Sequence, residues 1–215
     1  PLDGFAQTVA ALKAAGVKGA NVTVPFKLEA CLLADALSPA AEFAQAANTL
    51  KFLPEGTVLA DNTDGGGLCR DLDRQLRTLG LRLNQCQVLM IGAGGAASGC
   101  VAAFQHAGVQ HLTVLNRTAI KARELAERAE AIDLPAAGGG LDTPPSHFDV
   151  PGAPVVVVNA SSSSLKGEVP VIHPDWFERA VLVYDMMYAA QPTPFMRSIR
   201  NVETPCSDGL GMLVF

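Results

Sequence analysis

A continuous apolar run followed at once by a glycine-rich loop most constrains how this chain can fold. The run is Val88–Ile91, and Gly92-Ala93-Gly94-Gly95-Ala96-Ala97 comes directly after it. A run without polar alternation is typical of a strand that is buried on both faces, as in a parallel sheet covered by helices. The Ala-rich segment 96–107 has the composition of a helix. The loop therefore lies between a strand and a helix, as the phosphate-binding turn of a dinucleotide fold does.

The small residues of this loop each suit such a turn. Gly92 would make the tight turn, Gly94 would let the backbone approach a pyrophosphate, and Ala97 would permit close helix–strand packing. The helix N-terminus offers free N–H groups and a positive dipole end to phosphates. Glycine-rich turns also serve packing alone, but the strand–loop–helix–strand order favours nucleotide binding. The cofactor-binding candidates in the loop are Gly92, Ala93, Gly94, Gly95 and Ala96.

The second half of the chain continues to alternate apolar runs with helical patterns. Further strands are predicted at Leu112–Leu115, Val155–Val158 and Val181–Tyr184, and a helix over 119–131 with Ala122, Leu125 and Ala129 inward. Residues 134–153, rich in Gly and Pro, are predicted mostly as loop. Alternation of this kind predicts an α/β fold with a doubly wound, Rossmann-like parallel sheet.

The residues after the second strand bear on the choice of cofactor. An NAD enzyme usually has Asp or Glu about 20 residues after the loop, where it accepts from the ribose 2′-OH. Here the strand runs into Asn116-Arg117-Thr118, with Lys121 one turn on. Two cations suit a 2′-phosphate, so the pattern favours NADP over NAD. Thr118 as a plain N-cap and Arg117 as a surface charge remain compatible with that interpretation.

The first third of the chain has its own elements. Apolar spacing over 2–16 predicts a helix ended by Gly16, and further segments are predicted as a strand (Ala20–Val24), a helix (Leu28–Ala36) and a strand (Thr57–Ala60). Gly65-Gly66-Gly67 opens another helix, which we interpret as the join between two domains. Its apolar stripe is predicted to be Leu68, Leu72, Leu76 and Leu79, with Gly80 ending it.

Polar side chains gather where these predicted strands end. In Asn21–Lys27, Pro25 should stop the strand, Thr23 should face away from Val22 and Val24, and Lys27 should open the next element. Asn48-Thr49 and Asp61–Gly65 are two similar clusters after apolar stretches. Ligands of open α/β sheets bind at strand carboxyl ends. A lone lysine is more often a solvated charge, and Asn62 and Asp64 are also common turn residues.

Lys27 and Asp64 are the candidates for proton transfer. A lysine ammonium paired with a carboxylate can exchange a proton with a carbonyl or hydroxyl oxygen. Burial would lower the pKa of the lysine and a nearby carboxylate would raise it, so the sequence leaves its working pKa open.

Composition disfavours several classes of function. The chain has 215 residues and a net charge of −5 without a basic block, which disfavours nucleic acid as a partner. No apolar run approaches the roughly 20 residues of a membrane span, and no signal peptide is visible. Five cysteines without a C-x-x-C pair support neither a zinc site nor a disulfide framework. We therefore expect reduced thiols in a cytoplasmic enzyme.

Other reactive residue types show no catalytic pattern. The histidines lack ligand spacing and a matching acid, so we expect no metal site; they are His106, His111, His147 and His173. Ser161 to Ser164 could suggest a nucleophile, but no G-x-S-x-G elbow surrounds them, which disfavours a hydrolase.

Taken together, the polar clusters and the glycine loop resemble the shikimate dehydrogenase family. The matching segments run through essentially the whole chain: Asn21–Lys27, Ala47–Leu50, Asp61–Gly65, Gly92–Ala96, Asn116–Thr118, Asn159–Ser162, Tyr184–Tyr188, Thr193–Phe195 and Asp208–Leu213. The resemblance implies part of a substrate-binding domain over residues 1–66 and an NADP-binding domain over 67–208. Residues 209–215 would begin a segment that returns to the substrate domain.

The resemblance also implies an activity and roles for single residues. The activity is reversible NADPH-dependent reduction of 3-dehydroshikimate to shikimate, in the chorismate route to aromatic amino acids. Lys27 would be the catalytic lysine and Asp64 its paired aspartate, which also binds substrate. The other residues implied for the substrate are Thr23, Asn48 and Tyr188, and those implied near the nicotinamide are Ser161, Met186 and Gly209.

The chain departs from the family pattern at several points. A Ser-x-Ser segment that grips the substrate carboxylate in the family, and a Gln after the Gly-Met-Leu-Val run, are absent from this sequence. Ala47 stands where Val is usual, Ser161 where Thr is usual, and Lys121 where Arg is frequent. Two alternatives stay open: a quinate/shikimate dehydrogenase with relaxed specificity, and a non-catalytic NADP-binding fragment. The expected assembly is a monomer or a homodimer.

Overall fold

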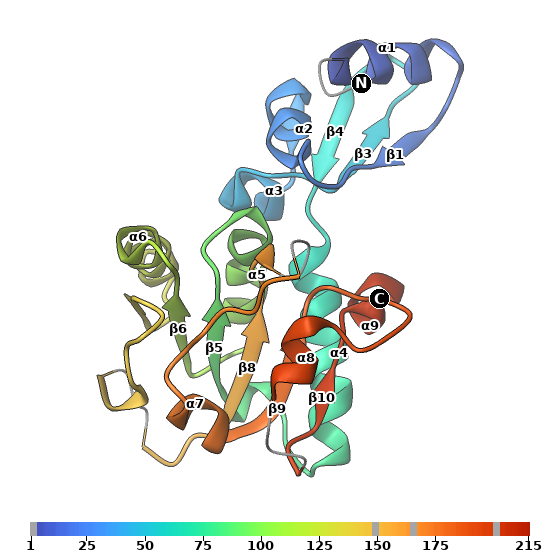
Figure 1. Cartoon of the computed structure of the whole chain (residues 1–215). Coiled ribbons are helices and arrows are strands. Elements are labelled where there is room, and N and C mark those ends of the chain that lie inside the picture. The colour runs from blue at the N-terminus through green and yellow to red at the C-terminus, as the bar shows by residue number, and fades with distance from the viewer. Residues whose placement is uncertain (1–3, 148–150, 164–166, 200–202) are drawn as a thin grey trace. The chain divides into compact units, whose positions relative to one another are not determined.

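The computed structural model describes residues 4–147, 151–163, 167–199 and 203–215. The chain forms two compact units, Pro1–Asp64 and Gly65–Phe215 (Figure 1). The division falls at the start of helix α4 (Asp64–Thr78). Each unit has its own sheet and its own buried core.

The first unit is a small mixed sheet with helices. Its strands lie in the order β1-β3-β4-β2, with β1–β3 and β3–β4 antiparallel and β2–β4 parallel. Its elements are α1 (Phe5–Ala14), β1 (Gly19–Asn21), α2 (Lys27–Leu33), β2 (Ala36–Leu37), α3 (Pro39–Ala44), β3 (Thr49–Phe52) and β4 (Val58–Asp61).

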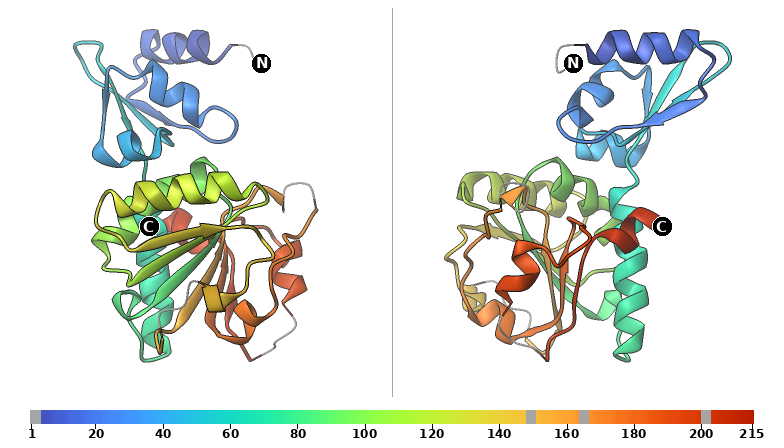
Figure 2. Two further views of the ribbon diagram at one scale, coloured as in Figure 1. Left: turned by 90° about the vertical axis from the view of Figure 1, so that its left-hand side faces the viewer. Right: turned by 45° about the vertical axis from the view of Figure 1, so that its right-hand side comes forward.

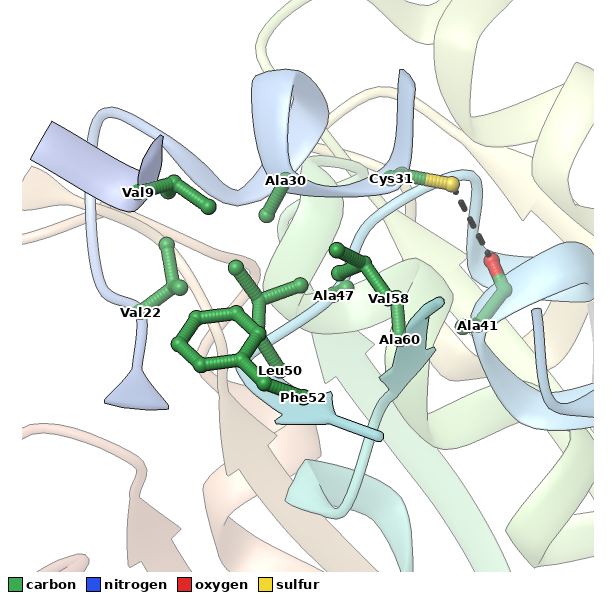
Figure 3. Packing of buried hydrophobic residues seen from close by; sticks show 10 residues of the cluster. All are labelled: Val9, Val22, Ala30, Cys31, Ala41, Ala47, Leu50, Phe52, Val58 and Ala60. Carbon is green, nitrogen blue, oxygen red and sulfur yellow. Dashed lines mark hydrogen bonds between the residues drawn. The ribbon is translucent and has the colours of Figure 1, made fainter. Parts of the chain in front are cut away.

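The core of this unit joins its helices to its central strands (Figure 3). Val9 from α1 and Ala30 from α2 pack with Leu50 and Phe52 of β3. Small residues let helix and strand approach closely, and Ala30 is fully buried. The packing fixes where α2 begins, and therefore where Lys27 lies.

The end of the first strand differs from the prediction. The strand ends at Asn21 instead of continuing to Val24. Val22 is buried, but Val24 is 64% exposed and does not share its face. The reason is a turn, in which the Phe26 N–H donates to the Thr23 carbonyl at 2.9 Å. The predicted position of Lys27 in the first turn of the next helix is confirmed.

The second unit contains a six-stranded sheet in the order β10-β9-β8-β5-β6-β7, with every pair parallel. Figure 2 shows this sheet from two further sides. After α4 its elements are η1 (Leu83–Gln85), β5 (Gln87–Ile91), α5 (Gly95–His106), β6 (His111–Leu115), α6 (Ala119–Glu130), β7 (Ala136–Gly139), η2 (Pro145–His147), β8 (Val155–Asn159), α7 (Asp175–Glu178), β9 (Ala180–Asp185), α8 (Pro194–Ser198), β10 (Cys206–Ser207) and α9 (Leu210–Val214).

Both faces of this sheet are covered. Every residue of β5 and β8 is buried. Trp176 of α7 and Phe195 of α8 pack in one cluster with alternate strand residues such as Leu89 and Val157. Tyr184 of β9 reaches Asp71 of α4 instead. The predicted α/β fold with a Rossmann-like doubly wound parallel sheet is confirmed.

One prediction for this unit is wrong. Leu79 is 42% exposed, because α4 ends at Thr78 and Leu79 lies beyond its buried stripe. The described residues of 134–153 are mostly loop, as predicted, but they also contain the short strand β7, which pairs with β6. Its Ala-Ala-Gly-Gly sequence has little strand propensity, and a Cβ at Gly138 would lie 2.4 Å from the backbone of Ala122 on α6. Close packing against α6 therefore explains the small residues.

Candidate active site

Lys27 and Asp64 form an ion pair in the first unit. Each is the first residue of its helix, Lys27 of α2 and Asp64 of α4. Lys27 Nζ lies 2.5 Å from Asp64 Oδ2, and the two side chains are 18% and 14% exposed. A pair this sheltered is screened less by water than a surface pair. The sequence prediction that these two side chains meet is thus borne out by the geometry.

Asn48 engages the other oxygen of Asp64. Its Nδ2 donates to Asp64 Oδ1 at 2.8 Å and to Thr63 Oγ1 at 3.0 Å. Its Oδ1 accepts from the Thr63 backbone N–H and from Thr49 Oγ1, both at 3.0 Å. Asp64 is therefore held from both sides, by an ammonium and by an amide.

Backbone bonds tie the three segments of this cluster together. The Ala47 N–H donates to the Lys27 carbonyl at 2.8 Å, and the Asn48 N–H to the Asp61 carbonyl at 3.0 Å. The Asn48 carbonyl accepts from the Val22 N–H at 2.7 Å. Residues 22–27, 47–49 and 61–64 are thus neighbours, although they are far apart in the sequence.

Asn62 is a site residue that our sequence reasoning treated only as a turn residue. It is 4% exposed, and its Nδ2 donates to the Ala46 carbonyl at 3.0 Å. Its Oδ1 accepts from the Asp64 N–H at 3.1 Å, which orients the start of α4. An Asn two residues before a helical Asp was the available signal, because such side chains bond backbone groups two residues on.

Two predicted substrate residues are not joined to this cluster by any described side-chain bond. Thr23 is exposed and lies in the turn before Lys27. Tyr188 belongs to the second unit, follows β9 and is 51% exposed. With this exposure, Tyr188 is not a core residue.

The glycine loop in the second unit has the conformation that its sequence predicts. Gly92 has φ +109°, and a Cβ there would lie 3.1 Å from the Ser161 backbone nitrogen. Gly94 is the N-cap of α5, without a side-chain cap, and a Cβ there would meet no described atom within 4 Å. Ala97 is fully buried. The N–H groups at the start of α5 and the open space beside Gly94 therefore fit a pyrophosphate.

The segment after β6 presents two cations. Asn116 Nδ2 donates to the Thr118 carbonyl at 3.1 Å, which closes the turn. Arg117 and Lys121 are exposed, and within the described ranges neither side chain makes a hydrogen bond or an ion pair. Thr118 is the N-cap of α6, but its side chain accepts no capping bond. The residues present therefore fit the 2′-phosphate of NADP.

Ser161, Met186 and Gly209 follow β8, β9 and β10 at one edge of the sheet. A Cβ at Gly209 would lie 2.2 Å from the Met186 carbonyl, so only glycine fits there. The Met186 N–H donates to the Asn159 carbonyl at 2.9 Å. Ser161 in turn adjoins Gly92, so the structure brings these residues together with the glycine loop.

Histidine, cysteine and carboxylate side chains form no candidate metal site in the described part of the chain, which contains no group of three of them that could hold a metal ion. None of the five cysteines forms a disulfide, and burial raises the pKa of the Cys86 and Cys206 thiols to about 11. His173 lies 3.4 Å from Asp175, so the expectation that no histidine has a matching acid is wrong. The side chain of His147 lies outside the described residues.

In the described ranges, no helix is both long and apolar enough to cross a bilayer.

Comparison with known families gives two matches. Residues 1–50 match the model described as the shikimate dehydrogenase substrate binding domain. Residues 74–137 match that described as shikimate / quinate 5-dehydrogenase. The two matched regions lie in the first and second units respectively.

Curated relatives extend the match to the whole chain. The chain is 46% identical to a shikimate dehydrogenase (NADP(+)) of Cupriavidus taiwanensis, over 100% of this chain and 72% of the relative. It is 44% identical to another of that name from Pseudoalteromonas atlantica, over 99% of this chain and 75% of the relative.

Solved structures agree with these relatives. An Ael1 enzyme from Pseudomonas putida has a TM-score of 0.81 and 37% identity, and the match covers 100% of this chain and 75% of that one. A shikimate 5-dehydrogenase from Thermus thermophilus, in complex with NADP(H) and shikimate, has a TM-score of 0.74 and 28% identity, covering 99% and 74%. The sequence and structural matches together show that this chain belongs to the shikimate dehydrogenase family.

Proposed function

We infer that this chain is an NADP-dependent oxidoreductase that reversibly reduces 3-dehydroshikimate to shikimate, a step towards chorismate and the aromatic amino acids. Its similarity along its whole length to shikimate dehydrogenases supports this activity. The observation that carries the assignment is the Lys27–Asp64 pair held by Asn48. It supplies a proton-transfer group and hydroxyl-binding groups in one cluster.

NADPH, when bound, supplies the hydride. The backbone around Gly94 and the N-terminus of α5 would bind its pyrophosphate, because N–H groups and the helix dipole favour phosphate there. Arg117 and Lys121 would bind the 2′-phosphate. Ser161, Met186 and Gly209 would border the nicotinamide.

Lys27 would give a proton to the carbonyl oxygen during reduction and take it back during oxidation. Asp64 would hold the ammonium in place, accept from a ring hydroxyl and balance the charge. Asn48 and Thr23 would bind further hydroxyls, and Tyr188 would also face the substrate. The bond that Asn62 makes to the Asp64 N–H would keep the carboxylate aimed.

The units are assigned different ligands. Residues 1–66 would serve as part of the substrate-binding domain and 67–208 as the NADP-binding domain, with 209–215 starting a segment that returns to the former. A negative net charge argues against a nucleic-acid partner, and cysteines outside disulfides are typical of the cytoplasm. We expect a monomer or homodimer and no membrane association, which light scattering and cell fractionation would test.

The test is identification of the product. The purified chain is incubated with 3-dehydroshikimate and NADPH, and the product is identified by mass spectrometry and chromatography beside a shikimate standard. We expect shikimate and NADP in equal amounts. Parallel reactions with shikimate or quinate and either NADP or NAD measure specificity. A protein that binds NADPH but yields no shikimate would contradict the assignment, and faster oxidation of quinate would favour relaxed specificity.

A further inference from the structure

A chain of hydrogen-bonded polar residues lies at the carboxyl ends of β8 and β9, and the proposed function uses only its last residue, Ser161. It consists of Thr193, Asp185, Asn159 and Ser161, which we call the β8–β9 relay. Asn159 and Asp185 are fully buried, and Thr193 is 3% exposed. Only Ser161, at the end of the relay, is partly exposed. Buried polar groups of this kind need fixed partners, so the relay has a defined direction.

Thr193 and Asp185 set that direction. Thr193 Oγ1 accepts from the Met196 N–H at 3.2 Å, so its own proton is free to be donated. It lies 2.6 Å from Asp185 Oδ2, to which it donates. Asp185 Oδ1 accepts from the Met187 N–H at 3.2 Å and from Asn159 Nδ2 at 3.1 Å. A carboxylate only accepts, so the NH₂ group of Asn159 must face Asp185.

The amide oxygen of Asn159 then faces Ser161. Asn159 Oδ1 accepts from the Ser161 backbone N–H at 3.1 Å and lies 2.7 Å from Ser161 Oγ. An amide oxygen has no proton, so the Ser161 hydroxyl must donate to it. Ser161 has one hydroxyl proton, and the hydrogen bond to Asn159 Oδ1 uses it. Towards any ligand, Ser161 Oγ can therefore only accept.

The sheet order indicates which ligand group meets Ser161. Strand β5 has β6 on one side and β8 on the other, and this reversal of strand order is where open α/β sheets bind ligands. The proposed 2′-phosphate cations, Arg117 and Lys121, lie after β6, which puts the adenosine half on that side. With the pyrophosphate at Gly94, the nicotinamide half falls on the β8 side, beside Ser161.

The hydrogen-bonding groups of the dinucleotide further limit which part of it can bind Ser161 Oγ. A phosphate oxygen offers only acceptors to Ser161 Oγ and would be unfavourable there. The carboxamide of nicotinamide offers an NH₂ donor. We propose that the β8–β9 relay makes Ser161 Oγ a dedicated acceptor for the carboxamide NH₂ of the nicotinamide, with Asp185 as a positioning residue. This inference rests on the NADP binding in the proposed function.

Cofactor analogues test the proposal through binding alone. The 3-acetylpyridine analogue of NADP replaces the carboxamide NH₂ with a methyl group and leaves the rest of the molecule unchanged. Dissociation constants for both dinucleotides are measured by calorimetry with the wild type, Ser161→Ala and Ser161→Thr. Ser162→Ala, at an exposed neighbouring serine, is the matched control.

We expect the wild type to prefer NADP over the analogue, and Ser161→Ala to lose about three- to tenfold in affinity for NADP only, the worth of one hydrogen bond. Ser161→Thr and Ser162→Ala should keep the preference. If Ser161→Ala weakens both dinucleotides equally, or neither, Ser161 only closes its local turn and the proposal is overturned.

Asp185→Asn tests the positioning role. An amide at 185 can donate as well as accept, so Asn159 would no longer be locked in one orientation. We expect a smaller preference for NADP over the analogue, and unchanged affinity for adenosine 2′,5′-bisphosphate, which lacks the nicotinamide half. Equal loss for the bisphosphate would indicate a merely structural role. If this variant does not fold, Ser161→Ala still decides the proposal.

The two proposals fail in different ways. A wild type that binds neither dinucleotide would overturn the cofactor assignment and the relay together. One that binds NADP with the expected preference, yet does not produce shikimate, would remove the proposed reaction and leave the relay standing.

Discussion

The two candidate sites of this chain are built in opposite ways. In the first unit, Lys27, Asp64 and Asn48 are side chains that satisfy one another. In the second, the glycine loop offers backbone and empty space, and the nearby cations make no ion pair among the described residues. A site of paired side chains suits proton transfer, because its groups are already oriented. A site of free donors suits an anion that brings the missing partners.

The largest effect is expected where the paired site loses its cation. Lys27→Ala should lower kcat for shikimate oxidation by about 10²- to 10⁴-fold, the usual worth of a general acid–base group. The dissociation constant for NADPH should stay within about twofold, because the binding groups proposed for it lie in the other unit. Stopped-flow kinetics and fluorescence titration measure the two quantities. Lys51→Ala, at an exposed residue of β3, is the control, and unchanged turnover in Lys27→Ala would remove the lysine from catalysis.

A methyl group in the open site should have the next largest effect. Gly94 has φ −92°, and its added Cβ would meet no described atom, so Gly94→Ala should leave the melting temperature unchanged. It should still weaken NADP binding roughly tenfold or more, because the methyl occupies the space the pyrophosphate needs.

Gly92→Ala should behave differently from Gly94→Ala. Its positive φ and its approach to Ser161 predict a loss of stability as well as of binding. Thermal melts and calorimetry separate the two variants. Tight NADP binding by Gly94→Ala would show that this loop does not hold the pyrophosphate.

Removing the exposed cation should change the cofactor preference. Arg117→Ala should weaken NADP binding by about ten- to a hundredfold and leave the affinity for NAD nearly unchanged, because only NADP carries the 2′-phosphate. Titration with both dinucleotides at two salt concentrations measures this. Arg123→Ala, also exposed and on α6, is the matched control. Parallel losses for both dinucleotides would place Arg117 elsewhere in the site.

The smallest effect is expected when Asp64 loses the hydrogen bond between its backbone N–H and Asn62. Asn62→Ala leaves the Ala46 carbonyl and the Asp64 N–H without this partner, which should cost about 1–3 kcal/mol of unfolding free energy. Turnover should fall less than in Lys27→Ala, because the ion pair remains. Urea unfolding beside steady-state kinetics measures both. Full stability with full activity would show that the Asn62 bonds do not matter.

The sequence predicts the long buried strands and their helices well, because continuous runs such as Val88–Ile91 leave few alternatives. It fails on short elements whose partners decide them. β7 is Ala-Ala-Gly-Gly and exists through β6 and α6. Two elements that were not predicted had recognisable sequence signals. Ser38 caps α3 with Pro39 in its first turn, which is typical of a helix start, and β3 (Thr49–Phe52) alternates in burial as a strand does.

The site residues also differ in whether the sequence alone could identify them. Lys27, Asp64 and the glycine loop could be named from local sequence and family resemblance. The role of Asn62 depends on a bond to Ala46, and the direction of the β8–β9 relay depends on Asp185 meeting Asn159 across two strands. Tertiary hydrogen bonds of this kind leave no periodic pattern, so only the structure identifies them.

The most direct test of the central claim is a double-mutant cycle on the ion pair. The value of kcat/KM for shikimate is measured for the wild type, Lys27→Ala, Asp64→Ala and the double variant, with the NADPH dissociation constant followed in each. If the pair acts as one unit, the double variant should be about as slow as the slower single variant, and NADPH binding should not change. Losses that multiply in the double variant would contradict the account, because the two residues would then act independently.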